Sequence, residues 1–224
     1  MPTFLKIGHR GAKAYETENT LESFRKAIDL GANAIELDVR TSGDGELILI
    51  HDDNLKRVFG RDMPVNGATL KELKELTGGR IATLDEALRD IGSKVEKILV
   101  ELKEVGYEDK VVETVRKMDL TNRAIIVSFH EESLARVRDR DRTIETGLIY
   151  TKFKKPLDAA LSLDARYIVP LYRFVHRTNV RKAHKKGLKV IVWTINTEIE
   201  ARNYRAKDVD GIATDKPDIL KGII

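Results

Sequence analysis

The chain has 224 residues, 42% of them hydrophobic, which is enough for one large domain with a substantial core and lies within the usual length of a barrel. Its 40 basic and 36 acidic residues leave a formal charge of only +4, and no basic run is interleaved with aromatic residues, which argues against a nucleic-acid partner. The absence of Cys excludes disulfides, thiol chemistry and zinc–thiolate sites.

The N-terminal segment runs directly into an apolar strand, expected at residues 4–8, without a signal-peptide pattern. No apolar run is long enough to span a membrane, so we expect a cytoplasmic protein with no stable membrane insertion. The strand ends in His9 and Arg10. A helix follows, for which Asn19 is the expected N-cap and Glu22 its partner in a capping box.

Two strands joined by a tight turn are predicted at residues 34–40 and 46–52. In the first strand, hydrophobic residues alternate with Glu36 and Asp38, so the two acids share a face that should be buried. Two carboxylates on a buried face are costly unless something neutralises them. The pair therefore marks this hairpin as a candidate site.

The expected register of the hairpin adds an imidazole to these acids. If Thr41 pairs with Glu46 across the turn, Glu36 falls opposite His51. One short hairpin then brings two carboxylates and a histidine together. That combination suggests a metal site with an acid–base group beside it.

A polar excursion at residues 53–80 contains Gly and Pro breakers and one predicted helix at 69–76. Another helix is predicted at 83–91, and both helices begin with a Thr-x-x-Glu capping box. From there on, strands and helices alternate regularly. The strands are expected at 97–103, 123–128, 145–150, 166–169, 188–193 and 210–213, and the helices at 107–118, 131–139, 155–163, 175–186 and 197–206.

Eight strands result if the first strand of the hairpin is counted without its return strand. This repetition predicts a single α/β domain over residues 1–224, a distorted (β/α)8 TIM barrel with an extra antiparallel strand and a short insertion at 53–80. An open doubly wound sheet fits less well, because no Gly-rich dinucleotide turn follows the first strand. The lack of Gln and the 34% of charged residues are typical of a thermophile, and no feature specifies an oligomeric state.

Functional groups of such barrels lie at the carboxyl ends of the strands. The acids expected there are Glu36, Asp38, Glu101 and Asp215. Glu101 and Lys103 should both point into the barrel mouth, because Leu102 must face the helices. Three carboxylates around one point form an all-oxygen site for one divalent cation, Mg²⁺ or Ca²⁺, with Mn²⁺ as a further option. The alternative is a buried salt-bridge network, with Arg10 and Lys103 paired to the acids.

His9 and His51 each end an apolar strand, and beside three acids they are predicted to be a general acid–base pair. A structural role is the alternative for each of them. His176 and His184 are expected at the surface of a basic helix, whereas His130 follows a strand and could lie at the edge of the site.

Other side chains at the expected mouth suit a phosphate-containing substrate. Arg10 and Lys103 supply positive charge where a phosphate oxyanion could bind. Trp193, the only tryptophan, ends a strand and either fills the core or walls a substrate pocket together with Phe129.

A set of short motifs occurs in the order seen in glycerophosphodiester phosphodiesterases. The motifs are Gly8-His9-Arg10-Gly11, Glu18-Asn19-Thr20, Glu36-Leu37-Asp38-Val39, His51-Asp52 with Leu55 and Arg57, Glu101-Leu102-Lys103, Trp193-Thr194 with Asn196, and Gly211-Ile212 with Thr214-Asp215 and Pro217. The chain resembles this family over residues 7–217. Thr17 stands where the family usually has Pro, which loosens a loop and leaves the chemistry intact.

The resemblance implies a distorted (β/α)8 enzyme that hydrolyses small-molecule glycerophosphodiesters to glycerol 3-phosphate and an alcohol. The implied metal ligands are Glu36, Asp38 and Glu101, the implied acid–base pair is His9 and His51, and the suggested phosphate contacts are Arg10 and Lys103. Attack by the glycerol 2-hydroxyl through a cyclic phosphate competes with direct attack by metal-bound water, and either histidine can be the base. The alternatives are a phosphodiesterase of the lysophospholipase D type and a non-catalytic phosphate-metabolite binding barrel. The second is disfavoured because both histidines and all three acids are present.

Overall fold

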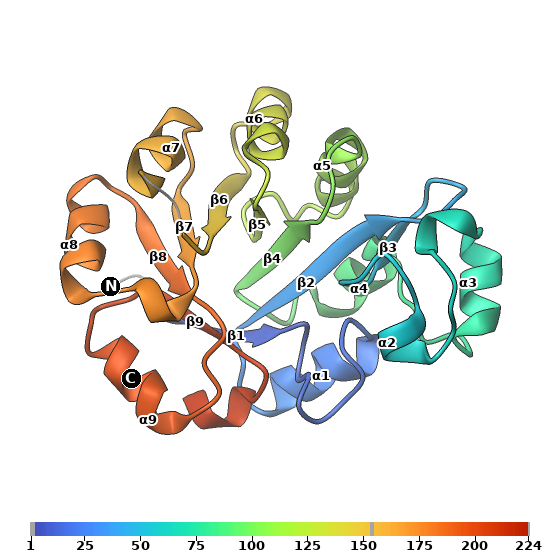
Figure 1. Cartoon of the computed structure of the whole chain (residues 1–224), viewed down its shortest axis with the longest axis horizontal. Coiled ribbons are helices and arrows are strands. Elements are labelled where there is room, and N and C mark those ends of the chain that lie inside the picture. Colours follow the sequence, from blue (N-terminus) through green and yellow to red (C-terminus); the bar gives the residue numbers. More distant parts are fainter. Residues whose placement is uncertain (1–2, 153–154, 224) are drawn as a thin grey trace.

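The computed structural model describes residues 3–152 and 155–223. Eight parallel strands close into a ring, in which β9 is hydrogen-bonded back to β1 (Figure 1). The ring strands, in their order around it, are β1 (Leu5–His9), β2 (Ala34–Thr41), β4 (Lys97–Leu102), β5 (Ala124–Ser128), β6 (Glu145–Tyr150), β7 (Tyr167–Pro170), β8 (Lys189–Val192) and β9 (Gly211–Thr214). The predicted TIM barrel is confirmed.

Helices surround the ring and pack their apolar faces against the outward side chains of the strands (Figure 1). They are α1 (Leu21–Asp29), α4 (Leu84–Ile91), α5 (Glu108–Lys117), α6 (Glu131–Arg140), α7 (Pro156–Ser162), α8 (Arg177–Lys185) and α9 (Glu198–Arg205), with short 3₁₀ turns η2 (Tyr172–Phe174) and η3 (Pro217–Leu220). None of the helices within the described ranges combines the length and the apolar character that crossing a bilayer requires.

The interior of the ring changes from apolar to charged along each of the strands that build the site. Ala34 and Leu99 belong to the apolar cluster that fills the barrel. Side chains two residues apart share a face, so Glu36 and Glu101 follow them toward the carboxyl end. The residues that alternate with these along each strand face the helices instead, as Leu37 does. The apolar layer thus closes the barrel below the charged groups.

The hairpin differs from its predicted register by one residue. β3 (Leu47–Leu49) is antiparallel to β2, and Thr41 pairs with Leu47 rather than with Glu46. The reason is the turn, because the Ser42 amide donates to the Glu46 carbonyl at 3.0 Å and leaves a loop of only three residues. The predicted four-residue turn was too long.

This shift separates the groups that the predicted register placed opposite each other. The last ladder bond runs from the Ile50 amide to the Asp38 carbonyl, and the chain then leaves the sheet. His51 therefore follows the strand and does not lie opposite Glu36, which corrects that prediction. Arg40 holds the new position, since its Nε donates to the His51 carbonyl at 2.9 Å.

The insertion after β3 forms a lobe beside the ring, at the right of Figure 1. It contains α2 (Lys56–Phe59), η1 (Val65–Gly67) and α3 (Leu70–Leu76). Only α3 was predicted, because helices of three or four residues are too short to show an apolar period. The lobe has its own apolar cluster, formed by Ile48, Ile50, Leu55, Val65, Ala68, Leu73 and Ile81. β3 separates this cluster from the barrel, since Leu47 and Leu49 face the other way and join the apolar layer between the ring strands and the helices.

Capping explains where several helices begin. The predicted capping boxes of Thr69 and Thr83 are both present. The N-cap of α1 is Thr20, however, whose hydroxyl accepts from the Ser23 amide at 3.2 Å. The prediction of Asn19 as this cap is wrong, because Asn19 has a φ of 58° and turns its side chain into the barrel mouth.

Candidate active site

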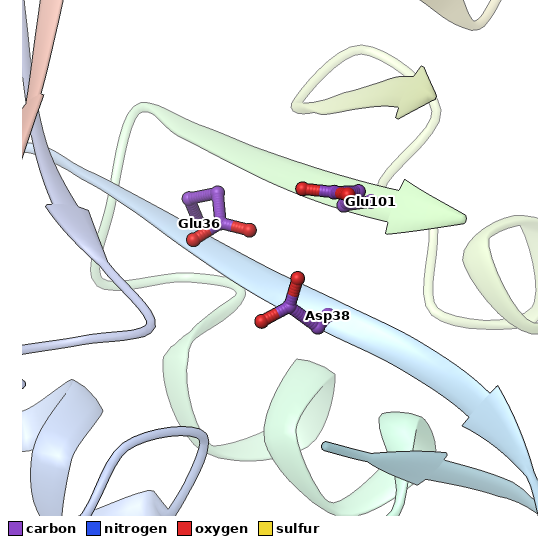
Figure 2. Close-up of side chains that lie close together, drawn as sticks. All are labelled: Glu36, Asp38 and Glu101. Atoms are coloured by element: carbon purple, nitrogen blue, oxygen red, sulfur yellow. The ribbon is translucent and has the colours of Figure 1, made fainter. Parts of the chain in front are cut away.

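Three carboxylates meet at the barrel mouth, two from within β2 and one from the carboxyl end of β4 (Figure 2). Strand register accounts for their approach, since Asp38 is the β-partner of Glu101 and Glu36 is the β-partner of His9. One oxygen from each carboxylate lies within 4.8 Å of the others. All three side chains are buried, so the acids singled out in the sequence form one cluster.

The cluster fits one hard divalent cation. Oxygens that share Mg²⁺ or Ca²⁺ lie at most about 4–5 Å apart, because each is about 2.0–2.6 Å from the ion. Two buried oxygens, Glu36 Oε1 and Asp38 Oδ1, have no hydrogen-bond partner among the described residues. Asp38 Oδ1 does lie 3.4 Å from Lys103 Nζ, as an ion pair. Carboxylate oxygens without a hydrogen bond are what a bound cation would satisfy.

The predicted salt bridges to these acids are present as well. Arg10 Nε lies 3.1 Å from Asp38 Oδ2, and Lys103 Nζ lies 2.5 Å from Glu101 Oε1. These two cations offset part of the charge of three carboxylates and leave a negative remainder. The salt-bridge network and the cation site therefore use the same groups, and the orphaned oxygens favour a cation.

Burial and mutual repulsion shift the pKa values of the three acids. Burial, and then the charges of Asp38 and Glu101, raise the pKa of Glu36 well above its usual range. Burial and the charge of Asp38 raise the pKa of Glu101 to about 7. Burial opposes the ionisation of Asp38 too, but Arg10 and Lys103 lower its pKa. Protons consequently compete with a cation for Glu36 and Glu101.

We expect the affinity for a divalent cation to rise between about pH 6 and pH 8. The pKa of Glu101 is about 7, so this carboxyl is mostly protonated at the lower pH and must release its proton for a cation to bind. Each such proton lowers the affinity by up to about tenfold per pH unit below the pKa. Mn²⁺ titration calorimetry in two buffers of different ionisation enthalpy measures both the affinity and the protons released. A constant affinity over this range would contradict the raised pKa.

His9 is oriented by an acid that follows the neighbouring strand, β9. Its Nδ1 lies 2.7 Å from Asp215 Oδ1, and its Nε2 lies 4.0 Å from Glu36 Oε2. Asn196 holds Asp215 in place by donating to Oδ2 at 2.8 Å. Asp215 has a lowered pKa despite its burial, because it accepts from His9 and Asn196. An ionised carboxylate can only accept, so Nδ1 carries the proton and Nε2 faces the acid cluster.

His51 repeats this arrangement from the insertion side. Its Nδ1 lies 2.7 Å from Asp52 Oδ1, which again fixes the proton on Nδ1. Burial lowers the pKa of His51, and Arg10 and Lys103 lower it further against the opposing charges of Asp38 and Asp52. A neutral imidazole with a free Nε2 is the form that a general base requires.

A cavity of about 170 Å³ brings these groups together. Its charged lining consists of both histidines and two of the three acids, Glu36 and Glu101, together with Arg10 and Lys103. The other side is apolar and is formed by Leu99, Val127, Phe129, Ile149, Val169, Ile191, Trp193 and Ala213. Phe129 and Trp193 meet edge to face with ring centroids 5.9 Å apart, and Trp193 Nε1 donates to the Val169 carbonyl at 2.8 Å. Trp193 thus lines the cavity and also packs on the apolar cluster inside the barrel, and its contact with a substrate stays a prediction.

Other predicted residues lie at the edge of the site or outside it. His130 Nε2 lies 3.3 Å from the Lys103 carbonyl, so it contacts the rim. His176 is exposed at the start of α8. His184 does not line the cavity, and its Nε2 lies 2.8 Å from Asp210 Oδ2.

Sequence reasoning placed Asp215 at the barrel mouth and included Asp52 in a motif, but it assigned neither of them as the partner of a histidine. Asp215 follows the last strand, which closes the ring beside β1, so ring closure offered a signal for its contact with His9. Asn19 was expected as a helix cap, and its contacts with Asp38 were not foreseen: its amide donates to Asp38 Oδ2 at 2.8 Å and accepts from the Asp38 amide at 3.1 Å.

Comparisons with known proteins point to one family. A model of the glycerophosphoryl diester phosphodiesterase family matches residues 9–219. The chain is 32% identical to a glycerophosphodiester phosphodiesterase of Caldanaerobacter subterraneus, over 98% of this chain and 97% of that protein. It is similar to the crystal structure of the Thermotoga maritima enzyme of that name, with 32% identity, a TM-score of 0.86 and 98% of each chain covered. A phosphodiesterase of Oleispira antarctica, solved with the product sn-glycerol-3-phosphate, has 27% identity and a TM-score of 0.87, with 96% of this chain and 94% of that chain covered.

Proposed function

Because the chain belongs to the glycerophosphoryl diester phosphodiesterase family, we propose that it hydrolyses glycerophosphodiesters to glycerol 3-phosphate and an alcohol, with a divalent cation and two histidines. The observation that carries the proposal is a cluster of three buried carboxylates next to one cavity that is lined by two histidines, each held by an aspartate. The Oleispira antarctica structure with sn-glycerol-3-phosphate supports the substrate class.

The acid cluster is the proposed metal site, with Glu36, Asp38 and Glu101 as ligands and Mg²⁺, Ca²⁺ or Mn²⁺ as the ion. When bound, the cation offsets phosphoryl charge and lowers the pKa of a hydroxyl that coordinates it. Arg10 and Lys103, no longer needed to neutralise the carboxylates, donate to the phosphodiester oxygens.

The histidines move the protons. One Nε2 takes the proton of the glycerol 2-hydroxyl as its oxygen attacks phosphorus, and the other protonates the alcohol oxygen as its bond to phosphorus breaks. Water then opens the cyclic phosphate with the two roles reversed, which leaves glycerol 3-phosphate. Both histidines keep their Nδ1 protons throughout, and these protons stay hydrogen-bonded to Asp215 and Asp52. Trapping a cyclic glycerophosphate supports this route, and its absence in single turnovers favours direct attack by water.

Phosphorus NMR of glycerophosphocholine hydrolysis, with and without a chelator, tests the function. We expect glycerol 3-phosphate to form when the cation is present and its formation to stop when the chelator is added. A binding barrel without chemistry would release nothing.

A cavity of about 170 Å³ suits a small alcohol, so lysophosphatidylcholine should react more slowly than glycerophosphocholine.

The apolar wall should select the alcohol. We expect Phe129→Ala to lower kcat/KM about tenfold for glycerophosphocholine and less for glycerophosphoglycerol, because a quaternary ammonium gains about 0.5–2 kcal/mol from aromatic faces. Steady-state kinetics with both substrates measures the difference. Ile199→Ala is the control, since Ile199 is 75% exposed and does not line the cavity. Equal losses for both substrates would contradict a role in selection.

A further inference from the structure

Arg57 joins the catalytic histidine of the insertion to the first loop of the barrel. It lies in α2, and its Nε donates to Asp52 Oδ2 at 2.5 Å, on the carboxylate that holds His51. Its two terminal nitrogens donate to both oxygens of Glu18, at 2.9 and 2.6 Å. The guanidinium therefore donates through both terminal nitrogens to one carboxylate and through Nε to another.

Glu18 has a second arginine on its other side. Arg10 Nη1 donates to Glu18 Oε1 at 2.9 Å, and the Arg10 amide donates to Glu36 Oε2 at 2.8 Å. The Glu18 side chain is only 6% exposed. Burial alone would raise its pKa, but Arg57, Arg10 and Lys13 lower it to about 2. One buried, ionised carboxylate thus contacts both arginines.

We propose that Arg57 and Glu18 are positioning residues of the reaction, and that their pair sets His51 and Arg10 together. The proposal rests on the function proposed above, because it assigns proton transfer to His51 and phosphate binding to Arg10. It adds that the two groups share a single support, although one belongs to the insertion and the other to the loop after β1.

The chemical consequence for His51 is a fixed tautomer. Arg57 is the main reason that the pKa of Asp52 is lowered to about 2, and its hydrogen bond also sets the direction in which Oδ1 points. Without Arg57, Asp52 can rotate toward solvent, since its side chain is 27% exposed. His51 then loses the acceptor that keeps its proton on Nδ1, and Nε2 is no longer held free for substrate.

The consequence for Arg10 is a fixed direction of its guanidinium. Within the described part of the chain, Glu18 is the one carboxylate hydrogen-bonded to the guanidinium, and the Nε edge faces Asp38 at 3.1 Å. Losing Glu18 should therefore affect phosphate binding as well as His51, whereas losing Arg57 should affect mainly His51.

Kinetics of Arg57→Ala, Arg57→Lys and Glu18→Gln with glycerophosphocholine test the proposal. Loss of a group that orients a catalytic side chain typically costs about 10–100-fold in activity. For Arg57→Ala we expect that loss in kcat with KM within about twofold, and partial rescue by added guanidinium ion. Arg57→Lys keeps the charge but lacks the guanidinium fork, so it should remain folded and still show most of the loss in kcat. Glu18→Gln should raise KM as well, and the double variant should lose less than the product of the single losses.

Lys56→Ala is the matched control. Lys56 lies on the same helix and pairs with Asp62 on the same insertion, outside the network. The proton NMR signal of His51 Nδ1–H, assigned with His51→Asn, provides a readout independent of turnover. We expect this signal in the wild type and in Lys56→Ala, and its loss in Arg57→Ala. An Arg57→Ala protein that keeps the signal and matches the kcat of Lys56→Ala would overturn the proposal. A wild type that shows the signal but hydrolyses no glycerophosphodiester would refute the proposed function instead.

Discussion

Glu101→Gln is expected to lose cation binding and turnover together. The change removes one of three clustered carboxylates and leaves a neutral amide oxygen in its place. Since the cation is proposed to stabilise charge on the phosphoryl group, we expect kcat/KM to fall by about 10²–10³-fold or more. Mn²⁺ titration calorimetry and phosphorus NMR of the same preparation measure both effects.

Glu96→Gln is the control for this substitution, because Glu96 is an exposed acid just before the other end of β4. It should bind cation and turn over like the wild type. A Glu101→Gln protein that binds cation weakly but keeps wild-type turnover would show that the cluster is not part of the chemistry. Normal cation binding in that variant would remove Glu101 from the ligand set.

His51→Ala is expected to lose activity while it still binds the cation. General acid–base catalysis typically contributes about 10²–10⁴-fold, so kcat should fall within that range. The oxygens of the acid cluster come from β2 and β4, whereas His51 follows β3, so its loss removes no ligand. Calorimetry on the variant should therefore give a Mn²⁺ affinity within a few-fold of the wild type.

The control for His51→Ala is His176→Ala, which changes an exposed histidine at the start of α8. It should retain wild-type kcat after its folding is checked by thermal melting. If His51→Ala keeps its activity, proton transfer by this residue is excluded. If it loses both activity and cation binding, His51 acts on the metal site instead.

The barrel and the acid cluster could be predicted because both follow from short-range patterns. Alternation of strand and helix segments gave the eight βα units, and the register of parallel neighbours then brings their carboxyl ends together. Glu36 and Asp38 stood out because a period of two places them on the buried face of β2. Glu101 joins them because β4 pairs directly with β2.

The supports of the histidines could not be predicted in the same way. The position of His51 differs according to whether the turn between β2 and β3 has three or four residues, and local patterns do not distinguish the two. In the structure Ser42 and Glu46 close a three-residue loop, in which the Ser42 hydroxyl accepts from the Glu46 amide at 2.9 Å. The ion pair of Glu18 and Arg57 joins residues 39 positions apart, through a four-residue helix that leaves no periodic signal.

The separate apolar cluster of the insertion has a consequence for how activity responds to heat. A lobe with a small core of its own can open locally at a lower free energy than the barrel needs to unfold. His51 and Arg57 would leave with that lobe, while the acid cluster would stay with the ring. We therefore expect heating to abolish the proposed activity before the barrel unfolds, with the acid cluster still in place, so that the lobe and not the barrel would limit the working temperature.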